Sequence, residues 1–96
     1  MVAYDPKIRW ARSATKHGVA QERSAFVIEH CGLLFHVPPP AGRVDERLMF
    51  LGDDEDGVAL EVMAVELEDG DLYVIHAMDL RDRYRPQYEE AKRWRI

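Results

Sequence analysis

The sequence predicts an α+β domain in which a short strand and two helices are followed by an antiparallel sheet and a closing helix. Three observations lead to this fold class. Apolar residues recur at helical spacing before residue 32, strand-like apolar runs begin at Leu33, and helical spacing returns after Asp79. A chain of 96 residues can bury one modest core, so we expect a single domain over residues 1–96.

The first third of the chain predicts a short strand and two helices. Residues 8–10 suit the strand. A brief helix then runs up to Lys16 and His17, and Gly18 ends it because glycine readily adopts the backbone conformation found just past a helix end. A second helix, which Gly32 ends, is predicted by residues that recur at intervals of three and four and so share one face. They are Ala20, Ser24, Val27, Ile28 and Cys31.

Four strands and a proline loop are predicted in the middle of the chain. The first strand covers residues 33–37, and the prolines at 38–40 then exclude both helix and paired strand. The next three strands are RLMFLG (47–52), VALEVMAVEL (58–67) and DLYVIHAM (71–78). Their connectors, DDEDG and EDGD, each hold a glycine that tolerates positive φ, as tight hairpins prefer. These three strands are therefore expected to form an antiparallel meander.

The closing helix is predicted to start at Asp79, whose side chain can cap it. An apolar stripe at helical spacing follows. It consists of Leu80, Tyr84, Tyr88, Ala91 and Trp94. Pro86 interrupts the stripe, because proline removes one helical hydrogen bond and disfavours helical backbone at Arg85, so we expect a kink or a new start there. We assign the aromatic residues of the stripe to core packing rather than to base stacking.

Charge is distributed unevenly along a chain whose net charge is −5. Residues 1–30 hold five basic and three acidic side chains, residues 31–80 hold two and twelve, and residues 81–96 hold six and three. Because phosphate binding rests on Lys and Arg, nucleic acid is expected as a partner only if the two basic ends meet in the fold. The charged N-terminus, the single cysteine and the lack of a membrane-length apolar run predict a cytoplasmic protein without disulfides.

Four stretches of the chain together resemble a known family. They are KHGV (16–19), the helix with Phe26, Val27 and Ile28, the strand RLMFLG (47–52), and the junction from His76 into the helix bearing Tyr88 and Glu89. In this order they resemble the BrnT family of toxins from bacterial type II toxin–antitoxin systems, which belongs to the RelE-like fold superfamily. The resemblance spans most of the chain and implies a RelE-like fold.

The resemblance also implies a function and partners. A BrnT-like toxin would be an mRNA-directed endoribonuclease that inhibits translation, acting on free or ribosome-bound mRNA. Its cognate antitoxin, for which a ribbon-helix-helix protein is one candidate, would hold it inactive, and no membrane would be involved. Met78 stands where BrnT-like sequences typically have arginine. The alternative is therefore a non-catalytic protein-interaction module of the same fold.

Metal-independent RNA cleavage needs a group that transfers protons near neutral pH and fixed cations that stabilise the charge developing on phosphate. His76 at the end of the last strand could transfer protons, and Arg81 and Arg83 in the first turns of the closing helix could hold phosphate. These three are the candidate catalytic residues. The candidate RNA-binding residues are Lys16, His17, Arg47 and Arg85.

Structural explanations stay open for the same side chains. We place His76 on one strand face with Leu72, Val74 and Met78, where a hydrogen-bonded histidine at the core edge is the alternative to a functional one. The arginines after residue 80 could simply keep the helix soluble, and the cations before Gly18 could interact with a helix dipole. A homodimer through the closing helix or through the last strand, expected at a sheet edge, is a further possibility.

No metal or other cofactor is predicted. His30, Cys31 and His36 have ligand-type side chains but lack the paired spacing of zinc sites. The stretch GDDEDG resembles a calcium loop but has Gly52 in place of the first carboxylate and Met63 in place of the closing glutamate. We interpret it as a hairpin turn.

Overall fold

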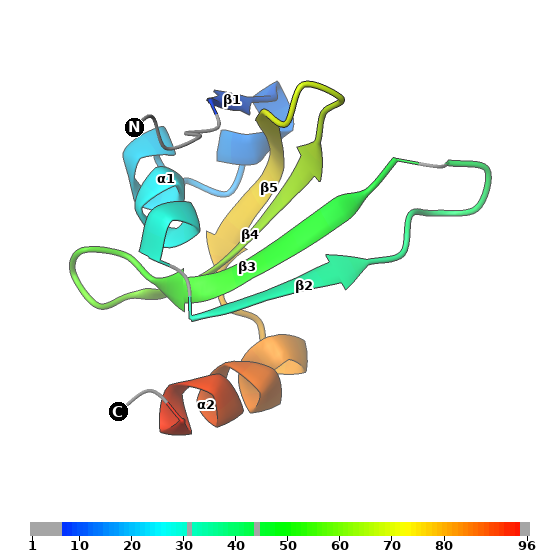
Figure 1. The fold of residues 1–96 in the computed structure, drawn as a ribbon. Coiled ribbons are helices and arrows are strands. Elements are labelled where there is room, and N and C mark those ends of the chain that lie inside the picture. The colour runs from blue at the N-terminus through cyan, green and yellow to red at the C-terminus, as the bar shows by residue number, and fades with distance from the viewer. Residues whose placement is uncertain (1–6, 31, 44, 95–96) are drawn as a thin grey trace, which may run out of the picture.

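A five-stranded sheet lies between two helices in the computed structural model, which describes residues 7–30, 32–43 and 45–94. The elements in chain order are β1 (Ile8–Trp10), the 3-10 helix η1 (Arg12–Thr15), α1 (Gln21–His30), β2 (Leu33–Val37), β3 (Arg47–Asp53), β4 (Ala59–Glu66), β5 (Leu72–Asp79), the 3-10 helix η2 (Asp82–Tyr84) and α2 (Arg85–Arg93). Figure 1 shows α1 on one side of the sheet and α2 on the other.

The order of the strands in the sheet is β1-β5-β4-β3-β2. Strands β2 to β5 form an antiparallel meander, and β1 adds to it in parallel, with Ile8 opposite Leu72 and Trp10 opposite Val74. This confirms an α+β fold with an N-terminal strand, an antiparallel meander and a closing helix. The expectation that residues 72–78 form a sheet edge is wrong for the part of β5 that pairs with β1. The edge strands of the described sheet are β1 and β2.

The segment predicted as the first of two helices is a single turn of 3-10 helix, η1. Its four residues are too few for the i to i−4 hydrogen-bond ladder of an α-helix. Ala14 is buried and fixes this turn to the core. Gly18 follows with φ of +82°, so the predicted stop at this glycine is confirmed.

Helix α1 confirms the second predicted helix and its buried face. Ser24 and Val27 are buried, and Ile28 packs against the same core. The Nε1–H of Trp10 donates to Ser24 Oγ at 2.9 Å, which joins β1 to α1. Ala20 precedes the helix and is exposed, so its predicted place on the buried face is wrong. Cys31, also predicted on that face, lies outside the described residues.

The two faces of the sheet bury separate apolar groups, as alternation along the strands requires. The α1 side buries Ala14, Val19, Val27, Leu48, Phe50, Leu60, Val62, Ala64, Leu72, Val74 and Ala77. The α2 side buries Met49, Leu51, Leu80 and Tyr88. No helix in the described part of the chain is long and apolar enough to cross a membrane.

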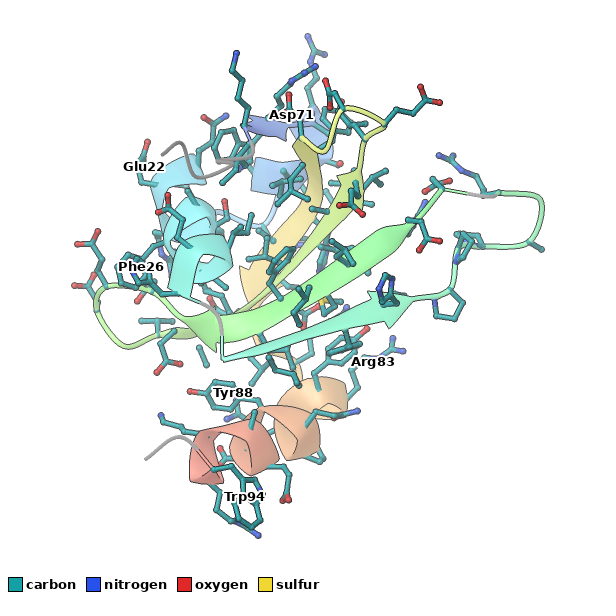
Figure 2. The ribbon with its side chains drawn as sticks, viewed as in Figure 1. Glu22, Phe26, Asp71, Arg83, Tyr88 and Trp94 are labelled. Carbon is teal, nitrogen blue, oxygen red and sulfur yellow. The ribbon has the colours of Figure 1, made fainter. Side chains whose placement is uncertain are left out.

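The closing helix begins later than its sequence predicts. Asp79 still belongs to β5, so it does not cap the helix, and α2 starts with Pro86 in its first turn, where the missing N–H is not needed. The new start expected at Pro86 is thus confirmed. Tyr88 lies between α2 and the sheet, as the stripe predicts (Figure 2). Trp94 points away from both and is 72% exposed, so the prediction that it packs in the core is wrong (Figure 2).

The turn between β3 and β4 is built by Asp54, which confirms the hairpin interpretation of GDDEDG. Its Oδ1 accepts hydrogen bonds from the backbone N–H groups of Asp56 and Val58, each at 2.9 Å. Its Oδ2 accepts from Arg23 Nε of α1 at 2.8 Å. Gly57 takes φ of +81°, which a residue with a side chain adopts only with strain.

A pair of leucine substitutions tests this account of the core. Leu60 on β4 is fully buried, so Leu60→Ala should lower the free energy of unfolding by about 2–5 kcal/mol, through lost apolar burial and the cavity left behind. Leu34 on β2 is 49% exposed, and Leu34→Ala should change the free energy of unfolding by less than about 1 kcal/mol. Urea denaturation of both variants measures the difference, and equal losses would contradict the described core.

Candidate functional site around Glu61

The strand β4 carries a fully buried carboxylate, Glu61. Its neighbours Leu60 and Val62 both face α1, so Glu61 faces the α2 side of the sheet. A carboxylate without access to water is costly unless it is paired and hydrogen-bonded. The arrangement around Glu61 therefore has to supply donors, and the residues that do so come from β5 and from the connection after it.

Two side chains and one backbone N–H surround the Glu61 carboxylate. Oε1 accepts from the backbone N–H of Arg81 at 2.9 Å and from its Nε at 3.1 Å. Oε2 accepts from Arg81 Nε at 3.0 Å and from a terminal guanidinium nitrogen at 2.6 Å. The Nε2 of His76 lies 3.0 Å from the same oxygen. Among the described residues no buried side-chain nitrogen or oxygen lacks a hydrogen-bond partner.

A β-bulge explains why His76 reaches Glu61. Ala64 pairs with Val74 but Met63 pairs with His76, so Ile75 is an extra residue on β5. The bulge reverses the alternation, and His76 points to the face opposite that of Leu72 and Val74. The prediction that His76 shares a face with these two residues is therefore wrong. Only Met78 of the predicted set is on its side.

The carbonyl of the bulged residue also holds the N-terminal segment in place. Ser13 Oγ of η1 donates to the Ile75 carbonyl at 2.7 Å. A few residues further on, the ring of His17 meets that of His76 edge-on, with 5.5 Å between centroids and 75° between planes. The basic N-terminal segment thus meets β5 at His76, and His76 shares the Glu61 carboxylate with Arg81 of the basic C-terminal segment.

Charge pairing sets the protonation of this group. Burial raises the pKa of Glu61, but the hydrogen bonds donated by Arg81 and His76 outweigh it, and the net pKa lies below the usual value. The carboxylate raises the pKa of Arg81 in turn, chiefly through the side-chain hydrogen bond. Glu61 is thus an anion that only accepts, held beside a permanent cation.

The predicted phosphate-binding arginines differ in how free they are. Arg81 is tied to Glu61, although its side chain is still 40% exposed. Its guanidinium carbon lies 5.6 Å from the ring centroid of Tyr84, and that of Arg83 lies 5.0 Å from the same centroid. Two cations therefore flank one aromatic ring, and Arg83 projects from the start of the closing helix beneath β2 (Figure 2).

The remaining predicted residues do not all join this group. Lys16 is the exposed neighbour of His17. Arg47 points to the same face of the sheet as Glu61, but from β3, and its Nε donates to Asp45 at 3.0 Å. Arg85 makes surface ion pairs of 3.7 and 3.8 Å within the helical segment. The structure thus links His17 to His76 and, through Glu61, His76 to Arg81. Arg83 lies near the Tyr84 ring that Arg81 also approaches, whereas Arg47 and Arg85 pair with other residues.

Sequence analysis missed Glu61. A signal was available, because a single acidic residue interrupts the apolar run VALEVMAV. In a strand with one face in solvent, however, alternation would place that acidic residue on the solvent side. Nothing in the sequence shows that helix α2 covers that side. The bulge at Ile75 has no marker in the sequence, so the pairing with His76 could not be found either.

A second polar group fastens α2 to the sheet and is structural. The hydroxyl of Tyr88 donates to Asp53 Oδ1, and Lys92 Nζ donates to the Tyr88 oxygen at 3.2 Å. Burial and, next, the Asp53 carboxylate raise the pKa of Tyr88, which keeps this hydroxyl protonated. Gly52 and Ala91 line the small space beside it.

The fold and the site together define an α+β protein with a mixed five-stranded sheet and a buried Glu–His–Arg group. The chain matches no protein-family model, and no curated protein matches it. No group of three or more His, Cys, Asp or Glu side chains within the described ranges is arranged to hold a metal ion. The chemistry available to this group is hydrogen bonding, proton transfer and charge stabilisation.

The lowered pKa of Glu61 predicts how stability depends on pH. The unfolded chain titrates this carboxyl near 4.5, above the folded value, so the unfolded state binds more protons in the interval between them. The stabilisation from this carboxylate is complete at pH values above the unfolded pKa, and it is lost as pH falls through the folded pKa. Glu61→Gln removes this stabilisation, so the difference in unfolding free energy between wild type and variant should narrow as pH falls from about 5 through the folded pKa.

Urea denaturation at a series of pH values measures both curves. A difference that stays constant over this interval would show that the Glu61 carboxyl has the same pKa in both states.

Proposed function

We propose that this protein is a BrnT-like toxin that cleaves RNA without a metal ion, with His76 as the proton-transferring group. Two kinds of support exist. One is the resemblance of its sequence stretches to that family. The other is a linked group of side chains, in which Glu61 binds His76 and Arg81, His17 contacts His76, and Arg83 lies near the Tyr84 ring that Arg81 also approaches. The observation that carries the proposal is the contact between His76 Nε2 and the Glu61 carboxylate. A histidine held by a buried carboxylate beside a guanidinium is a group suited to acid–base chemistry.

The chemistry needs no cofactor. The 2′-hydroxyl oxygen attacks the neighbouring phosphorus while its proton passes to a ring nitrogen of His76. The bond from phosphorus to the 5′ oxygen breaks, and that oxygen takes a proton from water. The products are a 2′,3′-cyclic phosphate and a 5′-hydroxyl end. Arg81 and Arg83 would stabilise the negative charge on the phosphate oxygens during this step.

The remaining proposed contacts concern the RNA backbone and protein partners. Lys16 and His17 would contact neighbouring phosphates, and Arg47 and Arg85 stay predictions as more distant RNA contacts. In the cell, mRNA would be the substrate. A cognate antitoxin, with a ribbon-helix-helix protein as one candidate, would block the site in the absence of stress.

Substitution of Arg83 tests the proposal. Expression of the protein without a partner should arrest growth, and the purified protein should cleave a labelled single-stranded RNA but not the same strand with 2′-deoxyribose. Arg83→Ala should lower cleavage about 100-fold and relieve the arrest, because a cation at the phosphate is lost. Arg93→Ala, which removes an equal charge near the far end of α2, is the matched control.

Arg81 needs a gentler change than Arg83. Arg81→Ala would leave the Glu61 carboxylate buried without its cation, at a cost of about 3–5 kcal/mol in stability, so Arg81→Lys is the informative variant. Full toxicity of the double variant Arg81→Lys with Arg83→Ala would remove Arg83 and the guanidinium of Arg81 from the mechanism, because lysine keeps only the charge at position 81.

A non-catalytic interaction module of the same fold is the second candidate, and one observation favours it. The charge of Arg81 is balanced by Glu61, which leaves Arg83 as the less restrained arginine of this site. On this alternative the labelled RNA is neither cleaved nor bound at low salt. Binding to a protein partner would change little between low and moderate salt, because few phosphate contacts are involved.

A further inference from the structure

We infer that Glu61 is the positioning residue of this site: it fixes the proton of His76 on Nε2 and leaves Nδ1 as the proton acceptor. The hydrogen bond is direct evidence for the first part. The carboxylate is buried and accepts only, so at 3.0 Å from Nε2 it requires an N–H on that nitrogen in both protonation states of the ring. The neutral ring then carries its lone pair on Nδ1.

The other nitrogen of His76 is free to act. Within the described residues Nδ1 has no hydrogen-bond partner, and the side chain is 21% exposed. The titratable and charged groups facing the ring are Glu61 from β4, Arg81 after β5 and His17 from the segment before α1. None of them accepts a proton from Nδ1. A substrate hydroxyl could therefore deliver its proton there.

The catalytic consequence rests on the proposed function, but the position of the proton does not. If the protein cleaves RNA, the 2′-hydroxyl proton passes to Nδ1 of neutral His76, the 5′ oxygen leaves with a proton from water, and the histidinium then returns its Nδ1 proton to water. Glu61 itself gains and loses no proton in this step. It touches neither substrate nor reacting atoms.

An isosteric variant should move the proton. In Glu61→Gln the side-chain oxygen should face the Arg81 backbone N–H, since that donor cannot move, whereas the exposed end of the guanidinium can turn away. The amide NH₂ then faces His76 and donates to Nε2. Neutral His76 would have to carry its proton on Nδ1 and could no longer accept one there.

The test is a nitrogen NMR spectrum of the histidine rings, recorded across the pH range in wild type and in Glu61→Gln. The chain has its own reference, because Nδ1 of His30 lies 3.1 Å from the Phe26 carbonyl, which requires a proton on Nδ1. Neutral His76 should show the Nε2–H form in wild type and the Nδ1–H form, like His30, in the variant.

RNA cleavage is measured on the same two proteins with the labelled single-stranded RNA. Glu61→Gln should lower the rate at neutral pH about 100-fold. Asp54→Asn is the matched control, because Asp54 is also a nearly buried carboxylate bound by an arginine and by backbone N–H groups, but has no histidine beside it. The Asp54→Asn protein should cleave the RNA at the wild-type rate, even if the substitution lowers its free energy of unfolding.

The outcomes separate the two claims. A wild-type His76 with its proton on Nδ1 overturns the inference without any variant, so the test survives a Glu61→Gln protein that fails to fold. An unchanged tautomer in the variant, or a variant that swaps the tautomer and still cleaves at the wild-type rate, also overturns it. A wild type with the Nε2–H form that cleaves no RNA refutes the proposed function and leaves the role of Glu61 in holding His76 intact.

Discussion

The placement of a carboxylate in the interior of a small domain constrains much of this fold. Glu61 has no contact with water, so its four lone-pair sites must be filled by donors from the protein. Arg81 supplies a backbone and a side-chain donor, which fixes how the chain leaves β5, and His76 supplies another. An apolar residue at position 61 would fit the core with less desolvation. The retained charge is the kind of local conflict that functional sites tolerate.

The bulge at Ile75 makes the site possible. Without this extra residue, strict alternation would turn His76 toward α1 and leave the Glu61 carboxylate with Arg81 alone. The same bulge presents the carbonyl that Ser13 binds, so the N-terminal segment and the histidine are positioned by one irregularity. The basic N-terminal segment therefore lies against β5, whose His76 shares the Glu61 carboxylate with Arg81 of the basic C-terminal segment.

Local patterns predicted most of the elements, and long-range packing decided what they missed. The three hairpin-linked strands, the turn at Asp54 and the new start at Pro86 follow from residues that act within a few positions of themselves. The 3-10 turn in place of a helix, the exposure of Trp94 and the parallel pairing of β1 with β5 depend on how neighbouring elements pack. At the site, the sequence identified His76 and Arg81 by residue type. It could not identify Glu61, because burial by α2 is a tertiary event.

The pairing of β1 with β5 has a consequence for how the chain is made. β1 precedes the other described strands in the chain, but its hydrogen-bonding neighbour β5 follows all of them, with Ile8 beside Leu72 and Arg9 bonded to Asp71. On the ribosome β1 must therefore stay unpaired until β5 has emerged. Pairing of β1 is then a late step in the formation of the sheet, and the contact between His17 and His76 can form only after β5 has been synthesised.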